Sequence, residues 1–102
     1  MFLVRRGFKV KKGSVRKAAD VIKRIGAMYE ESGDRSPARV YISGGSVPGP
    51  ANTVYMDWIE EVLRSPYRAD LKKPGQEEAL FEELRQYQEE SWIEFYELYD
   101  GS

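Results

Sequence analysis

The last residues of the chain constrain its fold more than any other stretch. The sequence SWIEFYELYDGS, residues 91–102, follows the run QEEALFEELRQYQEE, whose apolar residues recur at helical spacing. A helix continued to the end would approach about 27 residues, which is long for a domain of this size. Five of the eight residues 92–99 are aromatic or β-branched, a composition that favours a strand. We therefore predict a strand over residues 92–99.

The first half of the chain alternates strand and helix patterns. Phe2–Val10 alternates apolar and polar side chains as a half-buried strand does, with Gly7 as a candidate bulge. Apolar residues at steps of three and four then predict an amphipathic helix, with Ser14 as its N-cap and Gly33 near its end. Ala38–Ser43 predicts a second strand.

The glycine-rich loop GGSVPGPAN, residues 44–52, admits two interpretations. A phosphate-binding loop requires a helix N-terminus directly after the glycines. The sequence that follows, TVYMDWIEE, has a strand composition instead, so we predict a hairpin loop. Residues 63–75 carry two prolines and predict a connector. A second helix is predicted after it, with Leu80, Phe81, Leu84 and Tyr87 on its inner face and Glu77, Glu78, Glu82, Glu83, Glu89 and Glu90 on its solvated face.

This element order predicts a single α+β domain over residues 1–102. Strand–helix–strand–strand–helix–strand is the ferredoxin-like arrangement, a four-stranded antiparallel sheet with two helices on one face. Right-handed crossovers place the first strand in the middle of the sheet, beside the last strand. The first strand would then lie next to residues 92–99.

The charges are unevenly placed along the chain. Residues 1–24 contain nine Lys and Arg against one Asp, and residues 77–100 contain nine Asp and Glu against one Arg. The basic end could bind nucleic acid. Adjacent first and last strands would instead pair these charges, which cancels the electrostatic attraction that such binding needs. We therefore predict no nucleic-acid partner.

The composition excludes several kinds of chemistry. The chain has no His and no Cys. This rules out a Ser-His-Asp or Cys-His nucleophile, a His/Cys zinc site and histidine ligation of haem within the chain. We predict no metal and no cofactor. The absence of disulfides fits a cytoplasmic protein, and no apolar run reaches the roughly 18 residues of a membrane span.

The two faces of the predicted sheet differ in character. One face is apolar and matches the two helices, and it comprises Phe2, Val4, Phe8, Val10, Val40, Ile42, Val54, Met56, Trp58, Ile93 and Phe95. The other face is too aromatic to be left in water, so we predict a homodimer that buries it. The interface residues would be Tyr41, Tyr55, Asp57, Ile59 and Tyr96. Asp57 is expected to pair with Arg5 or Arg39, because an unpaired charge there is costly.

These features resemble a known superfamily. The order of elements, with FKVKKGSVRKAADVIK leading into the first helix and WIEFYELYD at the end, resembles the dimeric α+β-barrel superfamily. Within it the chain is most similar to NIPSNAP-type and antibiotic-biosynthesis-monooxygenase-like small proteins. The resemblance covers about Phe2–Asp100 and matches no catalytic signature. It implies a homodimer whose sheets pack face to face, with a cleft between each sheet and its helices.

Two functions follow from this resemblance, and the sequence leaves open whether the chain is an enzyme. The first is a non-catalytic protein that binds an apolar or aromatic small molecule in the cleft. The second is a cofactor-independent monooxygenase-like enzyme, whose aromatic substrate itself supplies electrons to O2. For either, Trp58, Tyr29 and Tyr87 are the candidate cleft residues, with Arg85 and Arg39 near the mouth. We favour binding, because no residues look arranged for proton transfer.

Overall fold

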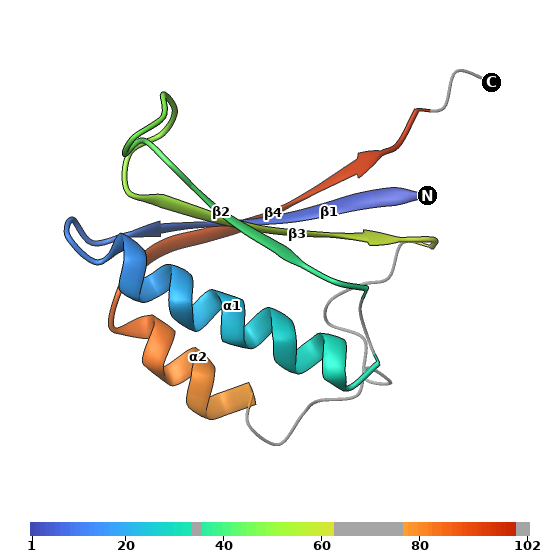
Figure 1. The fold of residues 1–102 in the computed structure, drawn as a ribbon, viewed down its shortest axis with the longest axis horizontal. Coiled ribbons are helices and arrows are strands. Elements are labelled where there is room, and N and C mark those ends of the chain that lie inside the picture. Colours follow the sequence, from blue (N-terminus) through green and yellow to red (C-terminus); the bar gives the residue numbers. More distant parts are fainter. Residues whose placement is uncertain (34–35, 63–76, 100–102) are drawn as a thin grey trace.

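A computed structural model describes residues 1–33, 36–62 and 77–99 of the chain. The order of its elements is the predicted βαββαβ (Figure 1). The elements are β1 (Phe2–Val10), α1 (Val15–Glu31), β2 (Arg39–Ser43), β3 (Thr53–Glu60), α2 (Glu77–Arg85) and β4 (Gln88–Glu97). The connector predicted for residues 63–75 lies outside the described residues.

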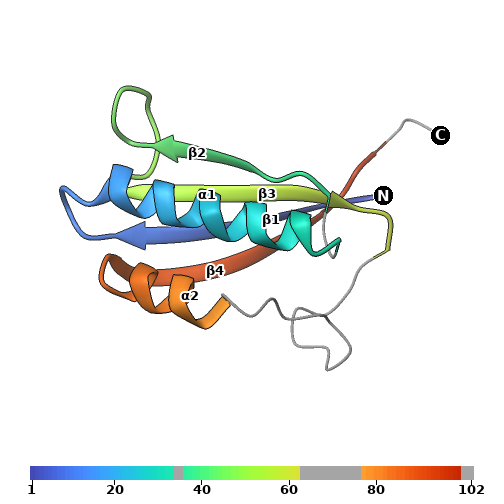
Figure 2. The same cartoon turned by 60° about the horizontal axis from the view of Figure 1, so that its bottom comes forward.

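The four strands form one sheet in the order β2-β3-β1-β4, and every neighbouring pair is antiparallel. Figure 2 shows both helices on the same side of this sheet, with α1 over its middle and α2 beside β4. The pairing of β1 with β4 confirms that the aromatic tail is a strand beside the first strand, although the strand ends at Glu97, two residues before the predicted end. The ferredoxin-like α+β fold is thus the one predicted from the sequence.

The boundary between α2 and β4 differs from the prediction. The helix ends at Arg85 and the strand begins at Gln88, so Tyr87, Glu89 and Glu90 do not belong to the helix. The chain reverses at Tyr87, whose N–H donates to the carbonyl of Leu84 and whose own carbonyl accepts from the backbone N–H of residue 11. Strand pairing with β1 therefore overrides the helical periodicity of the acidic run.

A bulge occurs between β1 and β4, near the start of β4, but Gly7 is not part of it. Lys9 pairs with Glu90 while Val10 pairs with Gln88, so the register shifts by one residue at Glu89. Gly7 itself lies in regular register with both of its neighbouring strands. The prediction of a bulge at Gly7 was wrong.

The helix α1 packs on the sheet through its apolar side. Its buried residues are Ala18, Val21, Ile22, Ile25, Gly26, Met28 and Tyr29. Gly33, with φ of +80°, adopts the left-handed conformation expected just beyond a helix end. Ser14 occupies the N-cap position, but its side chain makes no capping hydrogen bond. The predicted cap is therefore correct in place and lacks the contact that would stabilise it.

The core lies between the helices and one face of the sheet. On the strands it contains the predicted apolar residues Val4, Phe8, Val10, Val54, Met56 and Trp58. On the helices it contains the buried side of α1 together with Leu84 of α2. No helix in the described part of the chain is long and apolar enough to cross a membrane.

Candidate functional site

The candidate site is the face of the sheet turned away from the helices, which we call the open face. No helix among the described residues covers it (Figures 1 and 2). Strand pairing and side-chain alternation place on it Leu3, Arg5, Gly7 and Lys9 from β1, Arg39, Tyr41 and Ser43 from β2, Thr53, Tyr55, Asp57 and Ile59 from β3, and Glu90, Trp92, Glu94 and Tyr96 from β4.

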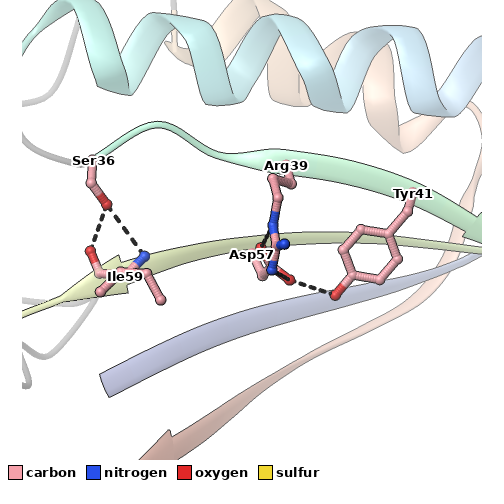
Figure 3. Close-up of polar contacts among 5 residues, drawn as sticks. All are labelled: Ser36, Arg39, Tyr41, Asp57 and Ile59. Atoms are coloured by element: carbon pink, nitrogen blue, oxygen red, sulfur yellow. Dashed lines mark hydrogen bonds and ion pairs between the residues drawn. The ribbon is translucent and has the colours of Figure 1, made fainter. Parts of the chain in front are cut away.

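Asp57 is the most buried charged residue on the open face. Only 3% of it is exposed. Arg39 donates to both of its carboxylate oxygens, at 2.9 and 3.1 Å, and the hydroxyl of Tyr41 donates to one of them at 2.8 Å (Figure 3). The two-pronged contact suits a planar guanidinium and a carboxylate, and it confirms the expected pairing with Arg39. Burial, and then the hydrogen bond to Asp57, raise the pKa of Tyr41, so this phenol stays protonated.

Glu94 is the second acidic residue of the open face that gathers several hydrogen-bond donors. Its carboxylate accepts hydrogen bonds from the hydroxyl of Tyr96, from Arg5 at 2.9 Å and from the indole N–H of Trp92 at 2.7 Å. These donors, with Tyr96 first, hold the pKa of Glu94 below its ordinary value. Arg5 also lies over the ring of Tyr55, with its guanidinium carbon 4.4 Å from the ring centre. The pairing of β1 charges with β4 charges is thus confirmed for Arg5 and Glu94.

Gly7 and Trp92 form a contact that the sequence reasoning missed. A Cβ added at Gly7 would lie 2.3 Å from indole carbons of Trp92, so the ring occupies the space where a side chain would be. The same ring meets Tyr55 edge to face, with ring centres 6.2 Å apart, and Tyr55 stacks on Tyr41 at 5.5 Å. The signal was a glycine in a strand interior facing an aromatic cross-strand partner.

Three of the five candidate cleft residues lie in or against one packed core, and the two arginines lie outside it. Trp58 and Tyr29 belong to the core beneath the helices, and the indole N–H of Trp58 donates to Glu60 at 2.9 Å. Tyr87 is half-buried at the turn after α2, and Arg85 is exposed and paired with the nearby Glu82. Arg39 lies across the sheet on the open face, bonded to Asp57.

The five predicted interface residues all lie on the open face, with different degrees of exposure. Tyr55 and Asp57 are already covered by other side chains of the same chain, at 8% and 3% exposed. Tyr41 and Ile59 are half-buried, whereas Tyr96 is 44% exposed. A surface that met this face would therefore touch Tyr96 far more than Tyr55 or Asp57.

One end of the open face is hollowed. A pocket of about 530 Å³ opens there. It is lined by Lys9, Pro50, Ala51, Asn52, Thr53, Glu90 and Trp92. Its size falls in the range of small-molecule sites, about 300–1,000 Å³. Among the described residues, no group of three or more acidic side chains is placed to hold a metal ion.

Several solved structures share the fold of this chain. No protein-family model matches the sequence, and no curated protein matches it. Among solved structures, a NIPSNAP domain protein from Burkholderia xenovorans superposes with a TM-score of 0.72 at 18% identity, covering 100% of this chain and 98% of that one. A NIPSNAP family protein from Agrobacterium tumefaciens superposes with a TM-score of 0.73 at 17% identity, covering 99% of this chain and 95% of that one.

A third solved structure extends the comparison to another kind of protein. An antibiotic biosynthesis monooxygenase superposes with a TM-score of 0.64 at 10% identity, covering 97% of this chain and 99% of that one. At such identities the likeness concerns the fold, which does not fix the activity. The chain therefore has the ferredoxin-like α+β fold that these NIPSNAP proteins and this monooxygenase share, as its sequence pattern predicted.

Proposed function

We propose that the chain works as a homodimer whose open faces pack against each other, and that it binds a small apolar or aromatic molecule on that face. The observation that carries the proposal is the open face itself. It holds three tyrosines, a tryptophan and two arginines, residue types that interfaces and ligand sites enrich. No helix of the described chain covers them.

Dimerisation is supported by the end of this face that the chain leaves open to solvent. Tyr96 and, just after β4, Leu98 are 44% and 41% exposed. Leu3 lies between Tyr96 of β4 and Ile59 of β3, and both Leu3 and Ile59 are half-buried. A second copy would bury these four side chains together, and apolar contact of this kind contributes about 25 cal/mol per Å². Tyr55 and Asp57 lie on the same face but are buried within the chain, so they would contribute little direct contact.

Binding fits the open face better than catalysis does. Asp57 is engaged by Arg39 and Tyr41, and Glu94 accepts three hydrogen bonds, so neither carboxylate is placed to take a proton from a substrate. The hydrogen bond to Glu94 raises the pKa of Tyr96, which disfavours a phenolate there. We place the ligand in the pocket at the end of the open face, because the core around Trp58 is packed.

The monooxygenase-like alternative is supported by the shared fold with the antibiotic biosynthesis monooxygenase. An oxygen electrode separates the two functions. Consumption of O2 by the purified protein with an electron-rich phenol or hydroquinone, above the rate of the phenol alone, would favour the enzyme. No acceleration, with saturable binding of the same aromatic compounds, is the result expected here.

Sedimentation velocity tests the dimer. The wild-type chain is expected to sediment as a dimer at micromolar concentration. Leu3→Lys places a charge among the exposed apolar residues and should shift the population to monomer, because a desolvated unpaired charge is costly. Glu82→Lys introduces the same residue on the exposed side of α2 and should leave the dimer intact. A monomeric wild type, or a Leu3→Lys variant as dimeric as the control, would refute the assignment of the interface.

A further inference from the structure

The pocket at the end of the open face has a rigid wall. Backbone carbonyls of residues 50–52 each accept a hydrogen bond, from Ser43 Oγ at 2.7 Å, Thr53 Oγ1 at 2.9 Å and the Val10 N–H at 2.9 Å. Asn52 adopts a positive φ of 52°, a conformation that asparagine tolerates better than most side chains. This wall is therefore held in place before any ligand arrives, which lowers the entropy lost on binding.

The opposite wall is an indole that cannot move freely. Trp92 is held by its hydrogen bond to Glu94, by its fit over Gly7 and by its edge-to-face contact with Tyr55. A fixed aromatic ring next to a cavity offers a surface for another ring, and two rings in contact attract each other beyond the apolar area that they bury. The pocket is thus suited to a ligand with an aromatic group.

Two opposite charges line the pocket and do not form an ion pair with each other. Lys9 and Glu90 are paired residues of β1 and β4 on the open face, and both are exposed. Within the part of the chain that the structure describes, neither side chain makes an ion pair or a hydrogen bond. A ligand with a single charge would be attracted by one of them and repelled by the other. A ligand carrying both an ammonium and a carboxylate group would satisfy both.

We infer that this pocket binds a small aromatic molecule carrying both an amino and a carboxylate group, the chemistry of a free aromatic α-amino acid. Its ring would lie against Trp92, its carboxylate beside Lys9 and its ammonium beside Glu90. The amide of Asn52 lines the same space and supplies further hydrogen-bonding atoms. The inference rests on the ligand-binding part of the proposed function, and it does not depend on the dimer.

Titration of the isotope-labelled full chain by NMR tests this inference. Three probes share one phenyl ring: L-phenylalanine, 3-phenylpropionate, which lacks the ammonium, and phenethylamine, which lacks the carboxylate. Phenylalanine is expected to shift the indole N–H signal of Trp92 and the backbone signals of Lys9 and Glu90. Each analogue should bind at least about threefold more weakly, the loss expected for one exposed ion pair.

Matched variants separate the charges from the fold. Glu90→Gln should weaken phenylalanine about threefold without weakening 3-phenylpropionate, and Lys9→Gln should do so without weakening phenethylamine. Lys23→Gln, an exposed position on α1, should change none of the affinities. Because all three replacements are at exposed positions, the variants are expected to fold. Trp92→Leu should weaken all three probes about tenfold through loss of the ring contact.

Three outcomes would overturn the inference. The first is the absence of any shift at the pocket with millimolar phenylalanine. The second is equal affinity for all three probes. The third is a set of shifts confined to the core around Trp58. If an uncharged aromatic compound shifts the open-face signals while phenylalanine does not, the inference fails and the proposed binding of aromatic molecules survives. Sedimentation of the same samples reports on the dimer separately.

Discussion

Gly7→Ala is the substitution that tests the description of the open face most directly. The new methyl group would lie 2.3 Å from the indole of Trp92, a separation that atoms do not tolerate, so the ring must leave its place. The indole is not a flexible chain end, because Glu94 and Tyr55 hold it on two sides. The smallest substitution available is therefore expected to dismantle a whole contact.

The size of the effect follows from what the ring gives up. A hydrogen bond to a charged group contributes about 1.5–3 kcal/mol and an edge-to-face ring contact about 0.5–1.5 kcal/mol. Alanine recovers about 0.4–1 kcal/mol by restricting the unfolded chain. Since Trp92 is only half-buried, we expect a net loss of about 1–3 kcal/mol, which lowers Tm by on the order of 10 °C.

Urea unfolding at fixed protein concentration measures the loss, and a double-mutant cycle assigns it. In a Trp92→Ala background the obstacle is gone, so Gly7→Ala should become neutral or stabilising. Gly45→Ala is the matched control, because a Cβ there meets nothing within 4 Å. If Gly7→Ala is as stable as the wild type, or equally harmful with and without the indole, then the Gly7–Trp92 contact does not exist as described.

Three further expectations concern the charges. Arg39→Ala leaves the buried carboxylate of Asp57 with the hydrogen bond from Tyr41, so it should lower the urea midpoint more than Arg85→Ala, which breaks an exposed pair. Equal effects of the two substitutions would refute the role of Asp57. Because the folded pKa of Glu94 lies below its ordinary value near 4.5, its stabilisation is present above that value and is lost as pH falls through the folded pKa. The stability gap between wild type and Glu94→Gln should therefore be largest at pH 7 and shrink below about pH 4.5, and a gap unchanged at pH 3 would contradict the assignment. Duplex DNA should show no appreciable affinity at physiological salt in fluorescence anisotropy, because Arg5 is paired with Glu94; tight binding that falls steeply with salt would oppose this.

The fold was predictable because several independent signals agreed. Residues 2–10 and 92–99 carry strand patterns, and their opposite charges favour adjacent positions. The start of β4 was not predictable from periodicity, because Tyr87, Glu89 and Glu90 fit a helix equally well. Only pairing with β1, a contact distant in sequence, turns those residues into turn and strand.

The candidate site was predictable in its charges and not in its aromatic packing. Alternation along β2 and β3 already placed Arg39 and Asp57 on one face, and their ion pair follows from it. The same alternation puts Arg39 and Trp58 on opposite faces of the sheet, which explains why Arg39 does not meet the candidates in the core. The contact of Trp92 with Gly7 was not predicted, because it depends on the register between β4 and β1. A register shift of one residue would turn Trp92 to the helix-covered face of the sheet.

The Gly7–Trp92 contact connects the fold to both proposals. Without a side chain at Gly7 the indole can lie across the centre of the sheet and cover Tyr55, which leaves the middle of the open face filled by the chain itself. The parts of the open face that remain accessible to solvent are its two ends. The end with Tyr96 offers apolar contact to a second copy, and the end with Lys9 and Glu90 offers a charged pocket. Because the two ends are separate, dimerisation need not close the ligand site, and Leu3→Lys should dissociate the dimer without abolishing the shifts that phenylalanine produces at Trp92. Loss of both properties in that variant would show that the pocket needs the partner chain.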